Sequence, residues 1–394
     1  MKKKVAIVGG GTAGLFLAAF INTDLYTVTI FEKKTSLGRK FLVAGDGGFN
    51  LTHSEELLSL KSRYNPTSFL NNALDYFSND ALRKWLVAVG IPTFIGSSGR
   101  VFPEKGIKPI DVLKTIEKHL IGKDIKFEFG KTFTGWDQDN SLEFNSKEII
   151  KSDYSVFALG GSSWKVTGSD GSWIQAFKKM GIDTLPFRSS NCAYKIMWPD
   201  KFIQVHEGKP LKNISISLEN KIQKGEAVIT KFGIEGNAIY ALSSEIQAIL
   251  ALKNEVVVYV DLKPSYNLST LIEKLTSSKS NTTVALRERI KLSRTAIELI
   301  KTTLTKEEFT DLKVLAKFIK QFPLKIVDSA PIEEAISTLG GINLKAVDSN
   351  FELKKVKNHF CIGEMLDWNA PTGGYLIQAC ASSGAYLAHQ LNNK

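Results

Sequence analysis

The chain has 394 residues, of which 43% are hydrophobic and 10% aromatic, enough to bury a sizeable core and to divide into two or three compact units. Its ordinary proline and glycine content and the lack of short-period repeats argue against disorder and against a solenoid. The formal net charge of +11 is compatible with an anionic ligand or RNA, but the basic residues are dispersed and few aromatic residues lie among them. We therefore expect a cationic surface and no nucleic-acid partner.

The apolar pattern and the cysteines narrow the class further. No stretch approaches the roughly 20 uninterrupted apolar residues of a membrane span. The start, MKKKVAIVGGG, imitates a signal peptide, but glycines interrupt its apolar run, so we expect a cytoplasmic protein. The three cysteines are odd in number and lack metal-ligand spacing, which predicts reduced thiols and no metal site. The sequence leaves the oligomeric state open.

The first expected element is a buried parallel strand at residues 5–8, followed by GGGTAG at 9–14 and an apolar helix. This stretch satisfies the G-x-G-x-x-G pattern, and a second strand at 26–33 contains Glu32, eighteen residues after Gly14. Such glycines allow a tight turn, the approach of a pyrophosphate and close helix–strand packing, while the acid can hold ribose hydroxyls. We predict a dinucleotide site in a Rossmann-like α/β domain.

A glycine-dense loop follows at 38–53, GRKFLVAGDGGFNLTH. Its glycines and polar side chains suit a loop laid over a cofactor, and Arg39 can pair with a pyrophosphate. His53 is a weak candidate for acid–base catalysis, since a loop histidine is more often structural. Arg100, in the turn SSGRVFP at 97–103, either reaches the substrate or cofactor or is an ordinary surface arginine, and both readings stay open.

Two further strands end on glycine. SDYSVFALGG at 152–161 carries an apolar run into Gly160 and Gly161, and NHFCIG at 358–363 ends directly before Glu364. The glycine junctions are therefore spread over the whole chain. A nicotinamide-binding domain is normally one contiguous block, so this spread favours FAD, which is held along its whole length.

The segment between these junctions reads as an insertion. Residues 1–188 and 327–394 are expected to form the FAD-binding domain. Residues 189–266 contain strand-like stretches and predict a β-rich domain, whereas residues 267–326 predict a helical subdomain in which Thr305 and Glu308 form a capping box.

Five stretches in order along the chain resemble the YhiN/BaiN-like family of bacterial flavoproteins, which are NAD(P)/FAD-dependent oxidoreductases. They are VAIVGGGTAGLFLAA, GRKFLVAGDGGFNLTHSE, SSGRVFPEKGIKPIDVL, GSSWKVTGSDGSW and GEMLDWNAPTGGYLIQACASSG. Two departures suggest a distinct branch: Gly48-Phe49 replaces Arg-Cys before Asn-Leu-Thr, and Leu159 replaces a threonine. Chemistry attributed to that arginine or cysteine is not transferred to this chain.

The resemblance implies a glutathione-reductase-type FAD-binding fold whose inserted part covers the flavin and forms the substrate cavity. It places Gly363 and Glu364 at the flavin ribitol and pyrophosphate, and the loop APTGGY (370–375) at the flavin N1/O2 edge. The residues expected to hold FAD are Gly9, Gly11, Thr12, Ala13, Gly14, Glu32, Lys33, Arg39, Lys40, Gly47, Asn50, Thr52, Ala158, Gly160, Gly161, Gly363, Glu364, Asp367, Gly373, Gly374 and Tyr375.

The expected function is that of an FAD-dependent oxidoreductase, which transfers hydride through flavin N5 to or from an unidentified small organic substrate. A nicotinamide nucleotide, NAD(P)H, is expected only as a transient visitor, because no second complete G-x-G-x-x-G occurs. Two alternatives stay open: an FAD-dependent RNA-modifying enzyme and a flavin-binding protein without turnover.

Overall fold

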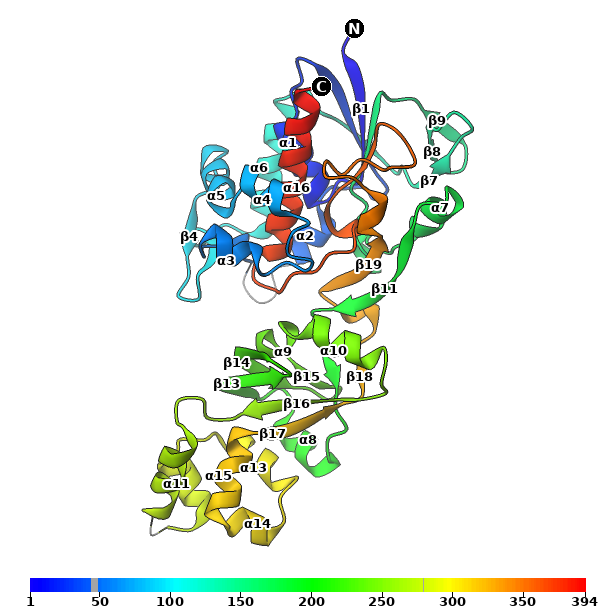
Figure 1. Ribbon diagram of the computed structural model, residues 1–394. Helices are drawn as coiled ribbons and strands as arrows, with labels where there is room; N and C mark the ends of the chain where they lie inside the picture. Colours follow the sequence, from blue (N-terminus) through cyan, green and yellow to red (C-terminus); the bar gives the residue numbers. More distant parts are fainter. Residues whose placement is uncertain (44–48, 279) are drawn as a thin grey trace. The chain divides into compact units, whose positions relative to one another are not determined.

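The computed structural model describes residues 1–43, 49–278 and 280–394, which fold into two compact units (Figure 1). The first unit contains residues 1–189 and 332–394, and the second contains residues 190–331. The chain thus leaves the first unit once and returns to it.

A five-stranded parallel sheet forms the centre of the first unit. Its strands, in spatial order, are β20 (His359–Cys361), β10 (Tyr154–Phe157), β1 (Lys3–Val8), β2 (Tyr26–Glu32) and β6 (Lys126–Phe129). The last four residues of β1 are all buried, as expected for a strand covered on both faces. Strands from the start, middle and end of the chain are therefore neighbours, and their carboxyl ends lie at one edge.

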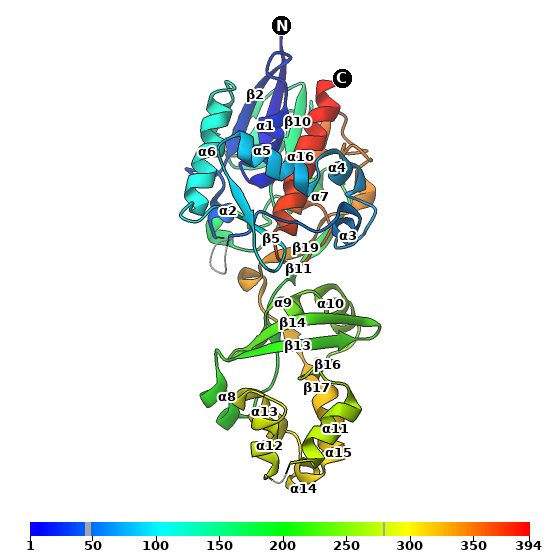
Figure 2. The same ribbon diagram turned by 90° about the vertical axis from the view of Figure 1, so that its left-hand side faces the viewer.

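Two helices from opposite ends of the sequence pack side by side, α1 (Thr12–Phe20) and α16 (Tyr375–Asn392), as both views show (Figures 1 and 2). The other helices of this unit are α2 (Arg39–Val43), α3 (Leu57–Lys61), α4 (Asn71–Tyr76), α5 (Asn79–Ala88), α6 (Pro109–Ile121) and α7 (Ile174–Lys179). Three small sheets complete the unit: β3 (Thr52–His53) with β5 (Arg100–Pro103) and β4 (Thr93–Ile95); β7 (Phe133–Trp136) with β8 (Leu142–Phe144) and β9 (Glu148–Ile150); and β11 (Thr184–Ser190) with β19 (Ser337–Ile342).

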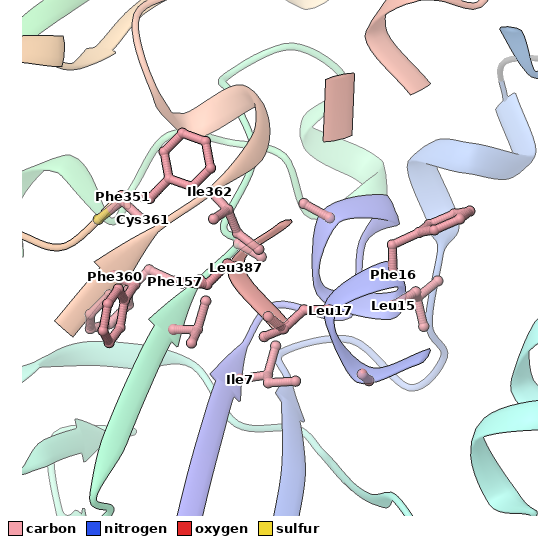
Figure 3. Close-up of a cluster of buried hydrophobic side chains, with 14 of the residues drawn as sticks. Ile7, Leu15, Phe16, Leu17, Phe157, Phe351, Phe360, Cys361, Ile362 and Leu387 are labelled. Atoms are coloured by element: carbon pink, nitrogen blue, oxygen red, sulfur yellow. The ribbon is translucent and has the colours of Figure 1, made fainter. Parts of the chain in front are cut away.

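The core between sheet and helices is built from residues distant in sequence. Ile7 of β1 and Phe157 of β10 lie close to Leu17 of α1 and Leu387 of α16 (Figure 3). All four side chains are fully buried. Because α16 supplies part of this core, residues near the end of the sequence are needed to complete the domain that its first residues begin.

The second unit contains a seven-stranded sheet and the remaining helices. In spatial order the strands are β17 (Phe322–Ile326), β16 (Val256–Asp261), β13 (Pro210–Leu218), β14 (Lys221–Ile229), β15 (Gly233–Glu235), β12 (Tyr194–Lys195) and β18 (Asp328–Ser329). The helices are α8 (Asp200–His206), α9 (Asn237–Tyr240), α10 (Ser243–Leu250), α11 (Leu268–Thr276), α12 (Thr282–Glu288), α13 (Arg294–Lys301), α14 (Lys306–Thr310) and α15 (Leu312–Lys320). The stretches predicted as β-rich and helical thus belong to one compact unit.

The predicted capping box is confirmed at the start of α14. The amide of Glu308 donates to the Thr305 hydroxyl at 3.2 Å, and the amide of Thr305 donates to the Glu308 carboxylate at 2.9 Å. The helical pattern that continues from there is interrupted at Asp311, whose carboxylate accepts hydrogen bonds from the first amides of α15. Among the described residues, no helix combines the length and apolar character that crossing a bilayer requires.

Candidate functional site

The turn between β1 and α1 contains glycines with contrasting surroundings. Gly9 has a φ of 108°, and a Cβ on it would lie 2.4 Å from the carbonyl oxygen of Ala158. A Cβ on Gly14 would lie 2.2 Å from the carbonyl oxygen of Gly9. By contrast, none of the described atoms outside its own chain neighbours lies within 4 Å of a Cβ built on Gly11. The turn is closed toward the sheet and open in front of Gly11.

The start of α1 presents backbone donors at this opening. The helix begins at Thr12 and continues through Ala13, and no side chain of the described residues caps it. Its first turn contains no acidic residue. Free N–H groups and the positive end of the helix dipole attract an anion such as a phosphate. The open space and the uncapped helix fit a pyrophosphate.

Glu32 ends β2 beside this turn. One carboxylate oxygen accepts a hydrogen bond from the amide of Gly10 at 2.8 Å, and the other accepts one from the amide of Lys34 at 2.9 Å. A carboxylate fixed in this way retains lone pairs for sugar hydroxyls. The neighbouring Lys33 forms an ion pair with Asp170 at 2.9 Å, which links β2 to the loop 164–173.

The second glycine junction follows β10. The amide of Ala158 donates to the carbonyl of Val8 at 2.8 Å, and the carbonyl of Gly160 accepts a hydrogen bond from the Trp173 indole at 3.1 Å. A Cβ on Gly160 would lie 3.3 Å from the Ser169 hydroxyl oxygen. That buried oxygen has no hydrogen-bond partner among the described residues. Buried polar atoms are normally hydrogen-bonded, so a hydroxyl without a partner beside a glycine turn is consistent with a polar ligand bound at this position.

Lys40 and Glu364, predicted as separate cofactor contacts, form an ion pair. The Lys40 ammonium lies 2.7 Å from one Glu364 oxygen and also donates to the Ser163 hydroxyl at 2.9 Å. A Cβ on Gly161 would lie 3.3 Å from the Glu364 carboxyl. The pair joins α2 to the turn after β20. Because Glu364 already neutralises the charge of Lys40, this lysine is a weaker phosphate ligand than its sequence position suggests.

The turn after β20 lies against α1. Gly363 has a φ of 75°, and a Cβ on it would lie 2.8 Å from the Cβ of Ala13. A Cβ on Gly384 of α16 would lie 2.5 Å from the carbonyl oxygen of Ala13. The glycine-rich segments of the two chain ends therefore meet at the first turn of α1, as a single long cofactor requires.

The loop before α16 is held by β3. Gly373 and Gly374 have φ values of 117° and 95°, and a Cβ on Gly374 would lie 2.6 Å from the Thr52 backbone. The fully buried Thr52 hydroxyl donates to the Gln378 side chain at 2.6 Å. No described side chain caps α16, which begins at Tyr375. Thr52 thus positions the loop, and the helix start offers backbone donors to an electron-rich ring edge.

His53 and Arg100 are brought together by neighbouring strands, as residues facing each other in the register of β3 and β5. His53 Nδ1 accepts from the Glu55 amide at 3.1 Å, and Nε2 lies 3.1 Å from the Ser98 carbonyl, which leaves the ring no free nitrogen. The half-buried Arg100 lies beside the loop, with its Nε 3.3 Å from a Cβ built on Gly373. Arg100 forms no ion pair with the described carboxylates, so its donors remain available.

One cluster at this site has no signal in the sequence. The Tyr375 hydroxyl donates to the Glu55 carboxylate at 2.6 Å, and the Arg63 guanidinium pairs with the same carboxylate at 2.9 Å. Burial alone would raise the pKa of Glu55, but hydrogen bonds from Arg63 and Tyr375 hold that pKa below its ordinary value. Burial and the Glu55 contact raise the pKa of Tyr375. The cluster fixes the first residue of α16.

Several predicted residues lie away from these contacts. Arg39 is exposed on α2, and Asp367 accepts a hydrogen bond from the Gly340 amide at 2.7 Å, so it braces β19. Gly47 lies outside the described residues, and Asn50 is the second residue after that segment.

The site also contains a cysteine. Cys380 lies in α16, and its sulfur is 3.5 Å from a Cβ built on Gly363. Burial raises the pKa of this thiol to about 12, so it is neutral at physiological pH. A neutral thiol is a poor nucleophile, which argues against thiolate chemistry here.

A parallel sheet with a glycine turn, an uncapped helix and a strand-end acid defines a Rossmann-type dinucleotide-binding protein. The profile of the HI0933-like protein Rossmann domain matches residues 3–390, and the chain belongs to this family. This membership confirms the resemblance drawn from the motifs. The chain is an FAD-dependent oxidoreductase.

Curated relatives match over nearly their whole length. The ribosomal RNA dihydrouridine synthase of Haemophilus influenzae is 26% identical, with 98% of each chain covered. The 3-dehydro-bile acid delta(4,6)-reductase of Clostridium scindens is 24% identical, again with 98% of each covered.

Two solved flavoenzymes share the fold. An open flavocytochrome c3 fumarate reductase has a TM-score of 0.52 at 13% identity, covering 100% of this chain and 78% of its own. The 3-ketosteroid delta1-dehydrogenase of Sterolibacterium denitrificans has a TM-score of 0.52 at 11% identity, with full coverage of both chains. These similarities support the predicted FAD-binding α/β fold.

Proposed function

We propose that this chain reduces a carbon–carbon double bond conjugated to a carbonyl group. A dihydrouridine synthase adds two hydrogens across such a bond in uracil, and a delta(4,6)-reductase of a 3-oxo compound acts on the same kind of conjugated system. The two relatives differ in substrate but share this bond chemistry. The reduction consumes one hydride and one proton and leaves a saturated bond beside the carbonyl.

The observation that carries the proposal lies at the loop before α16. There, among the described residues, no side chain caps the helix start and no carboxylate forms an ion pair with the neighbouring Arg100. FAD, when bound, supplies the hydride-transfer chemistry. The residues proposed to hold it are those of the turn 9–14, Glu32, Gly160, Gly161, Gly363, Glu364 and the loop 373–375.

Arg100 is the residue we assign to the substrate. Its guanidinium has donors to spare and lies beside Gly373, where a carbonyl oxygen of the substrate would accumulate negative charge during hydride addition. Hydrogen bonds from Arg100 would stabilise that charge. His53 is assigned a structural role, because both its nitrogens are engaged.

Reconstitution with FAD tests the proposal. The purified protein, loaded with FAD, is reduced anaerobically with NADH or NADPH and then mixed with a 3-oxo-delta(4) steroid or with uridine-containing RNA. Return of the flavin's yellow colour together with a saturated product supports the proposal. A flavin that is reduced but is reoxidised only by oxygen contradicts it, and so does a protein that does not take up FAD.

The candidate substrates are a small enone and a uracil within RNA. The small molecule follows from the bile-acid relative, and the NAD(P)H donor in this scheme is part of the proposal. RNA is the second candidate because one relative is named for ribosomal RNA, and the net charge of +11 is compatible with it.

A further inference from the structure

The inserted unit is more basic than the rest of the chain. Residues 190–331 contain 21 lysines and arginines against 15 aspartates and glutamates. This unit therefore carries just over half of the net charge of +11 in little more than a third of the residues. The positive charge is therefore not spread uniformly over the chain but is enriched in the inserted unit.

The charge gathers at the junction of α12 and α13. The stretch RERIKLSR covers residues 287–294, and its four basic side chains are all exposed. Ile290 and Leu292, between them, are buried in the unit. The basic side chains of the stretch are thus exposed to solvent, while the buried Ile290 and Leu292 hold the segment against the core of the unit.

The end of α8 extends this surface. Nδ1 of the buried His206 lies 3.2 Å from the Thr295 hydroxyl, which ties α8 to α13. Burial lowers the pKa of His206, and the nearby charges of Arg294 and Lys209 lower it further, whereas Glu298 acts in the opposite direction. Arg294 directly precedes Thr295, and the Lys209 amide donates to the His206 carbonyl at 3.1 Å, so both basic residues lie where α8 contacts α13.

We call Lys209, Arg289, Lys291 and Arg294 the basic face. None of these four forms an ion pair within the described residues. The acidic side chains of the same elements are Glu288, which pairs with Arg287 at 3.3 Å, and Glu298, which pairs with Lys301 at 3.0 Å. Two further acidic residues are exposed: Asp200 at the start of α8 and Glu207 after its end. The positive end of α13, capped by Ser293, adds to the potential.

We propose that the basic face of the inserted unit is a docking surface for the phosphate backbone of RNA. Arginine-rich surfaces with uncompensated charge suit phosphates, since each contact releases condensed counterions. RNA is the occupant that this charge favours, because a chain of regularly spaced phosphates can contact several of the four cations at once.

The test uses the full-length, FAD-loaded protein and deproteinised bacterial ribosomal RNA. The variant Arg289→Glu/Lys291→Glu/Arg294→Glu reverses the basic face. The matched control, Lys84→Glu/Lys114→Glu/Lys118→Glu, makes the same charge change at exposed positions on α5 and α6. Affinity is measured between 50 and 200 mM salt by filter binding.

Reversal is expected to weaken RNA binding at least about tenfold and to reduce the salt slope by about 2 units, because roughly three phosphate contacts are lost. The control should change affinity less than about threefold. If the glutamate variant does not fold, the alanine version at the same three positions replaces it, with a smaller loss in the same direction. Equal affinities of variant and control overturn the inference, as does binding of phosphatidylglycerol vesicles in place of RNA.

A second readout separates this inference from the proposed function. Flavin reduction by NADPH and reoxidation by a small enone are measured on the same samples. Unchanged small-molecule turnover with lost RNA binding supports the basic face as a docking surface. If RNA binds through the basic face but no conjugated bond is reduced, the proposed function fails and the surface stands. If enones are reduced but RNA does not bind, the basic face fails as a docking surface and the proposed function stands.

Discussion

At the turn after β1, Gly11 faces open space, whereas at the loop before α16 Gly374 faces packed protein. Gly11 has an ordinary φ of −82°, so the chain itself does not need a glycine there. Gly374 combines a φ of 95° with a Cβ position 2.6 Å from the Thr52 backbone. Gly11 leaves space for a ligand and Gly374 is required by the fold, although both loops are rich in glycine.

The largest stability effect is expected at the second loop. Gly374→Ala should lower the free energy of unfolding by about 3 kcal/mol, since strain at positive φ and a backbone clash act together. The matched control is Gly106→Ala, which has a φ of 94° with no described atom, apart from its chain neighbours, within 4 Å of a Cβ. That control should lose about 1 kcal/mol. Thermal and urea unfolding measure both, and similar losses would remove the distinction between the loops.

The next prediction concerns which of two neighbouring residues, Arg100 or His53, acts on the substrate. Arg100→Ala should lower turnover about 100-fold with FAD content unchanged, because a donor to the developing oxyanion is lost. Anaerobic reoxidation kinetics provide the measurement. His53→Gln serves as the control and should stay within about threefold of wild type. A larger loss at His53 than at Arg100 would reverse the assignment.

A smaller effect is expected at the first loop. Gly11→Ala should lower the stability of the apoprotein by only about 0.5–1 kcal/mol, because alanine is a poorer helix N-cap than glycine but meets no described atom at this position. It should weaken FAD binding about tenfold, which is about 1.4 kcal/mol. Gly14→Ala in the same turn should destabilise the apoprotein itself, since its Cβ would meet the Gly9 carbonyl. Unfolding and FAD titration are measured on both variants. A loss of FAD affinity at Gly11 and a loss of apoprotein stability at Gly14 would show that the two glycines serve different purposes.

The smallest effect concerns how α16 is held. Because the folded-state pKa of Glu55 is lowered, its contribution is present above the ordinary value of 4.5 and is lost as pH falls. Glu55→Gln should cost about 1 kcal/mol at pH 7, and the difference from wild type should vanish near about pH 3. Urea unfolding at several pH values tests this. A difference that grows on acidification would contradict the lowered pKa.

Much of the fold and cofactor site follows from local sequence patterns. A glycine turn after an apolar strand, a helix start and a strand-end acid each leave a signature within thirty residues, so the segment from Val5 to Glu32 predicts its own geometry. The ordered motifs likewise predict the family, which the comparison confirms.

Side-chain pairs across the chain could not be predicted this way. Lys40 and Glu364 are separated by 324 positions, and Tyr375 and Glu55 by 320. Periodicity and spacing carry no information at such separations, because the partners are brought together only by the packing of α16. Part of the basic face shows the same limit: Arg289, Lys291 and Arg294 are neighbours in sequence, but Lys209 joins them only through the contact of α8 with α13.

The close contact of Gly384 with the Ala13 carbonyl has a consequence for biosynthesis. Roughly 370 residues must be translated after α1 before its partner helix exists, on the order of 20 to 70 seconds at about 5–20 residues per second. During that time the surface of α1 that packs against α16 has no native cover, and it is open to non-native contacts and aggregation. Flavin loading is accordingly a late event, which follows synthesis of the final helix.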